Sequence, residues 1–336
     1  MFKVTHSVKA LGFTLLISAA LCLTPASADE NFNLKLAYAQ NSQPVKDALA
    51  RFGELVKEKT DGTVTVTYFP DSQLGGESEL VELLQTGAID MTKVSGGLMG
   101  SFSPLYDVFS MPYLFEDVDH FYAVMNDNKI MDDIYQSTRE QGFVGVGWYD
   151  SGQRNFYTED RPIEQPDDLK GMKIRVMQNQ NAVDMIRLLG GAPVVMSQGE
   201  IYTALQQGIL DGAENNEFAL TTARHGEVVN FYSLDGHTRV PDIILINSNT
   251  LSRMSDSQRQ ALMAAVKEST QLEIAQWDAA VAEARRQIQE NFDVKINDVD
   301  KSAFREAVQP MYEGLKNKPE QYQIYQEIEN LRAANH

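Results

Sequence analysis

Short strands and amphipathic helices alternate along the first third of the chain. Residues 32–39, 64–69 and 89–94 have the pattern of strands, and the segments between them carry apolar residues at helical spacing. This order predicts an α/β fold with a parallel sheet, in which ligands lie beyond the carboxyl ends of the strands. The polar residues that we expect at that edge are Gln40, Glu77 and Ser95.

The first 28 residues have the features of a secretory signal peptide. Lys3 and Lys9 give a basic start, and residues 11–23 form an apolar run too short to span a bilayer. Ala26-Ser-Ala28 is a small-residue cleavage site. We therefore predict cleavage after Ala28 and export to the periplasm, and we expect no membrane insertion of the mature chain.

The remaining 336 − 28 = 308 residues exceed a typical single domain, so two lobes are expected. The apolar run 143–149 breaks at Ser151-Gly152 and resumes, which is typical of a chain that crosses a hinge between lobes. A helical pattern over residues 255–292 is long enough to brace both lobes. The predicted divisions are 1–28 as leader, 29–152 as the first lobe with a return after about 240, 153–240 as the second lobe, and 241–336 as shared strands, long helix and C-terminal helices.

Charge and cysteine content narrow the function. The sequence has 29 basic and 47 acidic residues, and removal of the two leader lysines gives 27 − 47 = −20. Such an acidic chain is a poor partner for nucleic acid or an anionic membrane. The only cysteine, Cys22, lies in the leader, so we expect no disulfide and no thiol chemistry in the exported chain.

The usual signatures of catalysis are missing. The sequence contains no G-x-S-x-G, no P-loop and no H-E-x-x-H. The histidines beyond the leader are His120, His225, His237 and His336. We predict a chain that is not an enzyme and that uses no metal and no cofactor; a site of paired carboxylates is the alternative that sequence spacing leaves open.

An arginine lies inside a short strand pattern at residues 170–179. Met172, Ile174 and Val176 alternate with polar residues, and Arg175 falls on the second face of the strand. A buried guanidinium needs an anion, and its planar fork matches a carboxylate. The anion is either a ligand or an Asp or Glu of the chain itself.

Neighbouring residues favour a ligand. Arg154 at the lobe crossing lies beside Gln153 and Asn155, and Arg175 precedes Gln178 and Asn179, so both cations have neutral polar neighbours. Capture of a carboxylate needs fixed cations with amides for the remaining oxygens. Asn215, at the end of a short strand pattern, is a further donor.

Five runs in order resemble the DctP-type solute receptors of tripartite ATP-independent periplasmic (TRAP) transporters. They are residues 69–77 (FPDSQLGGE), 111–115 (MPYLF), 168–176 (DLKGMKIRV), 199–207 (GEIYTALQQ) and 211–215 (DGAEN). The resemblance implies a two-lobe, type II-like periplasmic binding protein that closes on an organic anion and delivers it to the membrane permease subunits. Arg175 matches the family arginine that forms a two-pronged salt bridge with the ligand carboxylate. Arg154 and Asn215 match further ligand contacts, and Glu77 matches an acid that contacts ligand hydroxyls in some members or, alternatively, is a helix N-terminal acid favoured by the dipole.

The polar set around these positions suggests a sugar acid. Residues expected to serve its hydroxyls are Glu77, Gln40, Ser95, Gln178 and His237, although His237 equally suits a surface loop. The sequence of residues 232–242 is similar to that of family members that bind hexuronates, so we predict a uronate such as glucuronate or galacturonate. A C4-dicarboxylate or keto acid is the alternative within the family, and a periplasmic sugar-acid enzyme is the alternative outside it.

Overall fold

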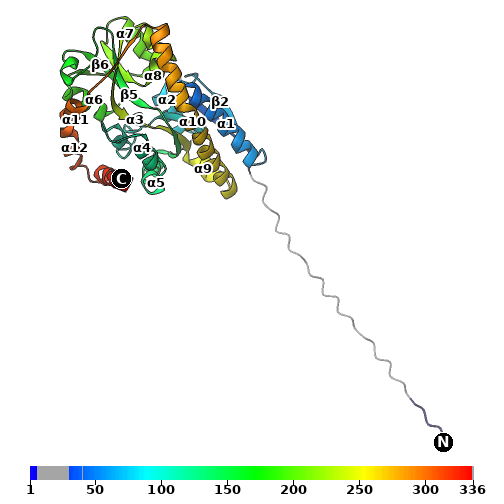
Figure 1. Ribbon diagram of the computed structural model, residues 1–336. Helices are drawn as coiled ribbons and strands as arrows, with labels where there is room; N and C mark the ends of the chain where they lie inside the picture. The colour runs from blue at the N-terminus through cyan, green and yellow to red at the C-terminus, as the bar shows by residue number, and fades with distance from the viewer. Residues whose placement is uncertain (6–29, 40, 335–336) are drawn as a thin grey trace.

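The protein is described by a computed structural model, which covers residues 1–5, 30–39 and 41–334. Two mixed β-sheets, each covered by helices, form two lobes (Figure 1). The first lobe is the part of the chain that packs on the five-stranded sheet, and the second lobe packs on the six-stranded sheet. The predicted two-lobe α/β fold is confirmed.

The first sheet collects strands from both ends of the chain. In spatial order it contains β2 (Val64–Phe69), β1 (Phe32–Tyr38), β3 (Met91–Ser95), β10 (Asp242–Asn247) and β4 (Phe143–Tyr149). β1 is parallel to β2 and β3, whereas β10 is antiparallel to β3 and β4. Asp242 is paired with both Ser95 and Tyr149, so β10 begins where β3 and β4 end.

The second sheet is built from the middle of the chain. In spatial order it contains β11 (Lys295–Asp298), β9 (Phe231–Arg239), β5 (Gln153–Thr158), β8 (Gly212–Asn215), β6 (Lys173–Val176) and β7 (Ala192–Val195). β5 runs antiparallel to β8 and β9, while β6 is parallel to β7 and β8. The start of β5 therefore lies beside the carboxyl ends of β8 and β9.

Helices pack against both sheets. They are α1 (Gln43–Lys59), α2 (Glu77–Gln85), α3 (Gly96–Met99), α4 (Val118–Met125), α5 (Asn128–Gln136), α6 (Gln180–Leu188), α7 (Ile201–Gln206), α8 (Glu217–Thr221), α9 (Ser248–Arg253), α10 (Asp256–Asn291), α11 (Ser302–Ala307), α12 (Gln309–Leu315) and α13 (Pro319–Ala334). In α1, Val45, Leu49, Phe52 and Val56 recur at spacings of three and four and are buried against the first sheet.

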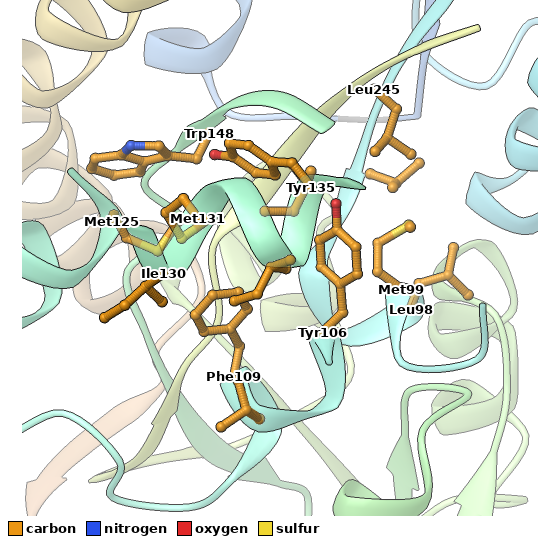
Figure 2. Packing of buried hydrophobic residues seen from close by; sticks show 14 of the residues in the cluster. Leu98, Met99, Tyr106, Phe109, Met125, Ile130, Met131, Tyr135, Trp148 and Leu245 are labelled. Atoms are coloured by element: carbon orange, nitrogen blue, oxygen red, sulfur yellow. The ribbon is translucent and has the colours of Figure 1, made fainter. Parts of the chain in front are cut away.

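The largest apolar cluster lies on one face of the first sheet. Figure 2 shows aromatic and methionine side chains in this cluster, among them Tyr106, Phe109 and Trp148. The MPYLF run contributes Met111, Leu114 and Phe115, which are all buried there. This segment is core packing that connects the sheet to α4.

The long helix α10 packs on both lobes (Figure 1). Leu262 and Val266 in its first half belong to the core of the first lobe, and Ile288 near its end belongs to a core of the second. A capping box at Ser255 and Gln258 begins the helix. The bracing helix that the sequence predicted is therefore present.

Two details of the sequence prediction are wrong. The sheets are mixed rather than purely parallel, because β10 re-enters the first sheet from the hinge side after the chain has visited the second lobe. Residues 235–239 are the second half of strand β9 rather than a surface loop: Thr238 and Arg239 pair with β5, and the pairing is irregular between Thr238 and Ser233. The exact residue boundaries of the lobes stay a prediction.

Candidate ligand-binding site

A cavity of about 670 Å³ lies between the lobes. It is found where the carboxyl ends of β3 and β8 meet the start of β5, as expected for ligands of α/β sheets. Predicted site residues that line it are Arg154, Arg175, Asn215, Glu77, Ser95 and Gln178. Its size lies within the range of about 300–1,000 Å³ that is typical of small-molecule pockets.

Arg175 on β6 is a buried cation with unused hydrogen-bonding capacity. The side chain is 4% exposed and lines the cavity. Its Nε donates to the Met196 carbonyl at 2.8 Å, but Nη1 has no hydrogen-bond partner and no carboxylate forms an ion pair with it among the described residues. Burial lowers the pKa of Arg175, and Glu214 only partly opposes this effect. Such a group strongly favours an anion that arrives from outside.

Arg154 on β5 has its carboxylate already. Its Nε lies 2.5 Å from Glu214 Oε2, and its Nη2 donates to Glu214 Oε1 at 3.0 Å, which is a two-pronged ion pair. Burial lowers the pKa of Arg154, but the facing carboxylate of Glu214 more than offsets this and raises it. Its Nη1 donates to Asn215 Oδ1 at 2.9 Å. Arg154 thus lines the cavity while its charge is neutralised by the chain.

His237 is not placed as a ligand contact. The side chain is fully buried in β9 and does not line the cavity, and its ring lies tilted against Phe156 at 4.6 Å between ring centroids. Its ring nitrogens lie 2.7 Å from Asp235 Oδ2 and 3.3 Å from Glu214 Oε2. A surface-loop position is wrong because the ring is fully buried behind Glu214, where the pairing of β9 with β5 is irregular; a direct ligand contact by His237 stays a prediction.

The pKa values of these groups follow from their pairing. Burial alone would lower the pKa of His237, but Asp235 and Glu214 raise it to about 9. Burial would raise the pKa of Glu214, but Arg154 and His237 lower it to about 2. Glu214 is therefore shared by Arg154 and His237, which leaves the guanidinium of Arg175 without a facing carboxylate of its own and suited to a ligand carboxylate.

Asn215 and Ser95 have their own contacts at the cavity wall. Asn215 Oδ1 accepts bonds from Arg154 and from the Asn216 backbone, while its Nδ2 is only 3.4 Å from Gln198 Oε1. Ser95 caps α3 by accepting the backbone N–H of Gly97 at 3.3 Å. The amide N–H groups of Asn215 are thus weakly engaged and available to a ligand oxygen.

Gln178 connects the two lobes. Its Oε1 accepts the Ser78 hydroxyl at 2.7 Å, and its backbone carbonyl accepts the Ser101 hydroxyl at 2.6 Å. Ser78 belongs to α2 and Ser101 follows α3, both in the first lobe. The side chain lines the cavity and helps to hold the lobes together in this arrangement.

The first-lobe wall contains charged residues that the sequence reading missed. Lys93 on β3 is buried, and its Nζ lies 2.6 Å from Asp242 Oδ2 and 3.8 Å from Glu77 Oε1. Burial raises the pKa of Glu77, although Lys93 acts in the opposite direction. Glu77 also accepts the Ser95 backbone N–H at 3.2 Å. Glu77 is the first residue of α2, so it combines the helix-terminus position with a place in the cavity wall.

Signals for the missed residues were present in the sequence. Lys93 is a lysine inside the apolar strand pattern 89–94, and Glu214 is an acid inside the 211–215 run. Both are buried charges in strands, which require partners. An aromatic pair, Phe218 and Trp277 at 5.3 Å between ring centroids, also lines the cavity and had no distinguishing pattern.

Two predictions fall outside the described residues. Gln40 is the first, and the predicted cleavage after Ala28 is the second. In the described part of the chain, no helix has the length and apolar character needed to cross a membrane.

A two-lobe α/β protein with a cavity between its lobes that is lined by buried arginines has the architecture of a solute-binding protein. The DctP family model, bacterial extracellular solute-binding protein family 7, matches residues 37–318. The chain belongs to this family of extracytoplasmic solute-binding proteins, as the five sequence runs implied.

Several relatives have been solved with a bound sugar acid. A TRAP periplasmic solute-binding protein from Anaerococcus prevotii, solved with bound D-glucuronate, is 36% identical, covers 90% of this chain and 99% of its own, and has a TM-score of 0.87. One from Sulfitobacter, solved with bound β-D-galacturonate, is 33% identical over 89% of this chain and 100% of its own, with a TM-score of 0.84. An uncharacterized protein of Salmonella typhimurium, YiiZ, is 54% identical over 97% of this chain and 100% of its own length.

Proposed function

We propose that this chain is a periplasmic receptor that binds a hexuronate, such as D-glucuronate or D-galacturonate, and presents it to a TRAP permease. The observation that carries the proposal is the buried Arg175, whose Nη1 has no partner among the described residues and which faces a cavity shared by both lobes. The ligand carboxylate binds the guanidinium fork, and closure of the lobes excludes water and strengthens this ion pair.

The remainder of the cavity supports a sugar acid over a simple acid. The amide of Asn215 and the hydroxyl of Ser95 offer donors, and Glu77 and Asp242 offer acceptors for ligand hydroxyls. Phe218 and Trp277 offer an apolar surface for the C–H face of a sugar ring. The related proteins solved with glucuronate and galacturonate support the same ligand class.

A thermal-shift panel of the purified exported chain tests the proposal. The panel contains D-glucuronate, D-galacturonate, an aldonate, succinate, malate and a keto acid. A ligand at 100 times its Kd stabilises the folded state by about 2.7 kcal/mol. At roughly 2–4 °C per kcal/mol for chains near this size, the melting temperature should rise by about 5–10 °C with a uronate.

Other outcomes of the panel would contradict the proposal. Stabilisation by succinate or malate and by no sugar acid would replace the uronate with a dicarboxylate. Uronate consumed during a long incubation, followed by NMR of the small molecule, would point to an enzyme. Uronate glycosides and neutral sugars serve as controls, because a neutral sugar lacks the carboxylate that Arg175 requires.

A further inference from the structure

Lys93 and Asp242 form an ion pair in the cavity wall of the first lobe. Their side chains are 3% and 7% exposed, and both residues line the cavity. Lys93 Nζ also donates to Asn41 Oδ1 at 2.8 Å. Asp242 Oδ1 accepts no hydrogen bond from the residues that the structure describes, which leaves one carboxylate oxygen available.

Fold stability does not account for this pair. Removing two charges from water costs several kcal/mol each, and apolar residues of the same volume usually serve a core equally well. The neighbours of the pair on strands β3 and β10 include the buried apolar side chains of Val94, Ile243 and Ile244. The pair is located at the cleft end of both strands, where its polar atoms can reach a ligand.

We propose that Lys93 and Asp242 together read hydroxyl groups of the bound sugar acid at the end remote from its carboxylate. This inference rests on the proposed uronate-binding function. Arg175 belongs to the second lobe and the pair to the first, so they are on opposite walls of the cavity. An ammonium that donates and a carboxylate that accepts match adjacent sugar hydroxyls, since each hydroxyl can accept from one group and donate to the other.

The same wall selects against a second carboxylate. Glu77 and Asp242 present two carboxyl groups on this wall, and the single ammonium of Lys93 is already paired with Asp242 at 2.6 Å. A dicarboxylate held by Arg175 would place its second carboxylate against this wall and be repelled. The two walls therefore distinguish a monocarboxylate with hydroxyls from a C4-dicarboxylate.

Calorimetry with D-glucuronate and a set of its deoxy derivatives, each lacking one hydroxyl, tests the assignment. Asp242→Asn should weaken D-glucuronate binding roughly 10- to 100-fold, the range for a lost charged hydrogen bond. One deoxy derivative lacks the hydroxyl that Asp242 contacts. For that derivative, the affinities of Asp242→Asn and of the wild type should differ less than about threefold, because neither protein can form the contact. Lys93→Met provides a second variant of similar length.

Controls separate this role from a structural one. Glu217→Gln removes the buried carboxylate of the Glu217–Arg285 pair, which does not line the cavity, and should leave affinity for every ligand unchanged. An equal loss of affinity for all derivatives in Asp242→Asn would overturn the subsite while leaving the proposed function intact. Failure of the wild-type protein to bind any uronate would overturn the proposed function itself. Deletion of single hydroxyls without effect on the wild type would again refute the subsite, even if neither variant folds.

Discussion

Two buried arginines in the second lobe differ in how their charge is balanced. Arg154 is paired with Glu214 through two nitrogens, whereas Arg175 has a hydrogen bond only to the Met196 carbonyl within the described residues. Burying a cation without an anion is costly, so a carboxylate that pairs with Arg175 would remove an unfavourable electrostatic free energy. The buried Arg175 thus lowers the stability of the fold and raises the affinity of the site for an anion.

Substitution of Arg175 by lysine should fail to restore binding. Lysine keeps the positive charge but loses the planar fork and the Nε bond to Met196, so Arg175→Lys should weaken uronate binding by about 2–5 kcal/mol. Isothermal titration calorimetry measures the change. Arg187→Lys, on the exposed surface of α6, is the matched control and should bind as the wild type does. Wild-type affinity in Arg175→Lys would disprove the bidentate contact.

Substitution of Glu214 should destabilise the fold. Glu214→Gln leaves Arg154 and His237 without a carboxylate that both contact, so the free energy of unfolding should fall by about 3–5 kcal/mol at pH 7. Because the folded-state pKa of Glu214 is lowered to about 2, this stability is present above pH 4.5 and is lost as the pH falls toward 2. Urea denaturation at pH 7 and pH 3 measures both effects.

Glu227 provides the control for that experiment. It pairs with Arg224 at the surface, where solvent screens the charges, so Glu227→Gln should change stability far less than Glu214→Gln does. If both substitutions lowered the free energy of unfolding equally, burial of the Arg154–Glu214 pair would not increase its contribution to stability.

At the element scale, α10 joins the lobes through a buried carboxylate. Glu273 in the middle of the helix is fully buried, and its Oε2 accepts the Asp150 backbone N–H at 3.1 Å at the first lobe crossing. Asp150 in turn pairs with Arg239, which precedes the second crossing, and accepts the Tyr122 hydroxyl at 2.9 Å. The helix and both crossing segments therefore share one hydrogen-bonded cluster.

Titration of Glu273 should contribute to the pH dependence of the protein's stability. Burial, and then the charge of Asp150, raise its pKa to about 9, with Asp242 acting in the same sense and Arg239 against it. Above pH 4.5 the folded state therefore holds more protons than the unfolded state. The contribution of protonated Glu273 to the free energy of unfolding is full below pH 4.5 and is lost as the pH rises through 9. Melting temperatures between pH 5 and pH 9 should fall less in Glu273→Gln than in the wild type.

The quantity to compare is the difference in melting temperature between the wild type and Glu273→Gln at each pH. His237, whose pKa is raised to about 9, contributes a fall between pH 6.5 and 9 in both, so it cancels in the comparison. Parallel curves for wild type and Glu273→Gln would show that Glu273 does not titrate in this range.

At the scale of the whole molecule, the segment after β6 holds the lobes together. Asn179 Nδ2 donates to the Gly97 carbonyl, to Asp107 Oδ1 and to Ser110 Oγ, and each distance is 2.9 Å or less. These three acceptors belong to the first lobe, because residues next to them in the chain are part of its core. Its Oδ1 caps α6 by accepting the Ala182 N–H. One side chain thus begins a helix in one lobe and binds the other lobe.

Loss of these bonds should weaken the closed state without removing a ligand contact. Asn179→Ser keeps a good helix cap but cannot reach the first lobe, so ligand dissociation should accelerate roughly tenfold, the equivalent of about one hydrogen bond. Stopped-flow release of a bound uronate measures the rate. Gln180→Ala, which loses only a bond to Asp184 within α6, is the control. An unchanged dissociation rate in Asn179→Ser would exclude a role in closure.

The amino-acid sequence by itself determined the α/β alternation, the long helix and the presence of a strand cation at Arg175, because hydrophobic periodicity and helix caps are local properties of the chain. The tertiary structure decided which charges meet. Lys93 and Asp242 are 149 residues apart, and Arg154 and Glu214 are 60 apart, yet both pairs are in contact. Strand order sets such pairings, and it placed His237 behind Glu214, neutralised Arg154, and left Arg175 to face the cavity. A buried charge is visible in a sequence pattern, whereas its partner is chosen by the topology of the sheet.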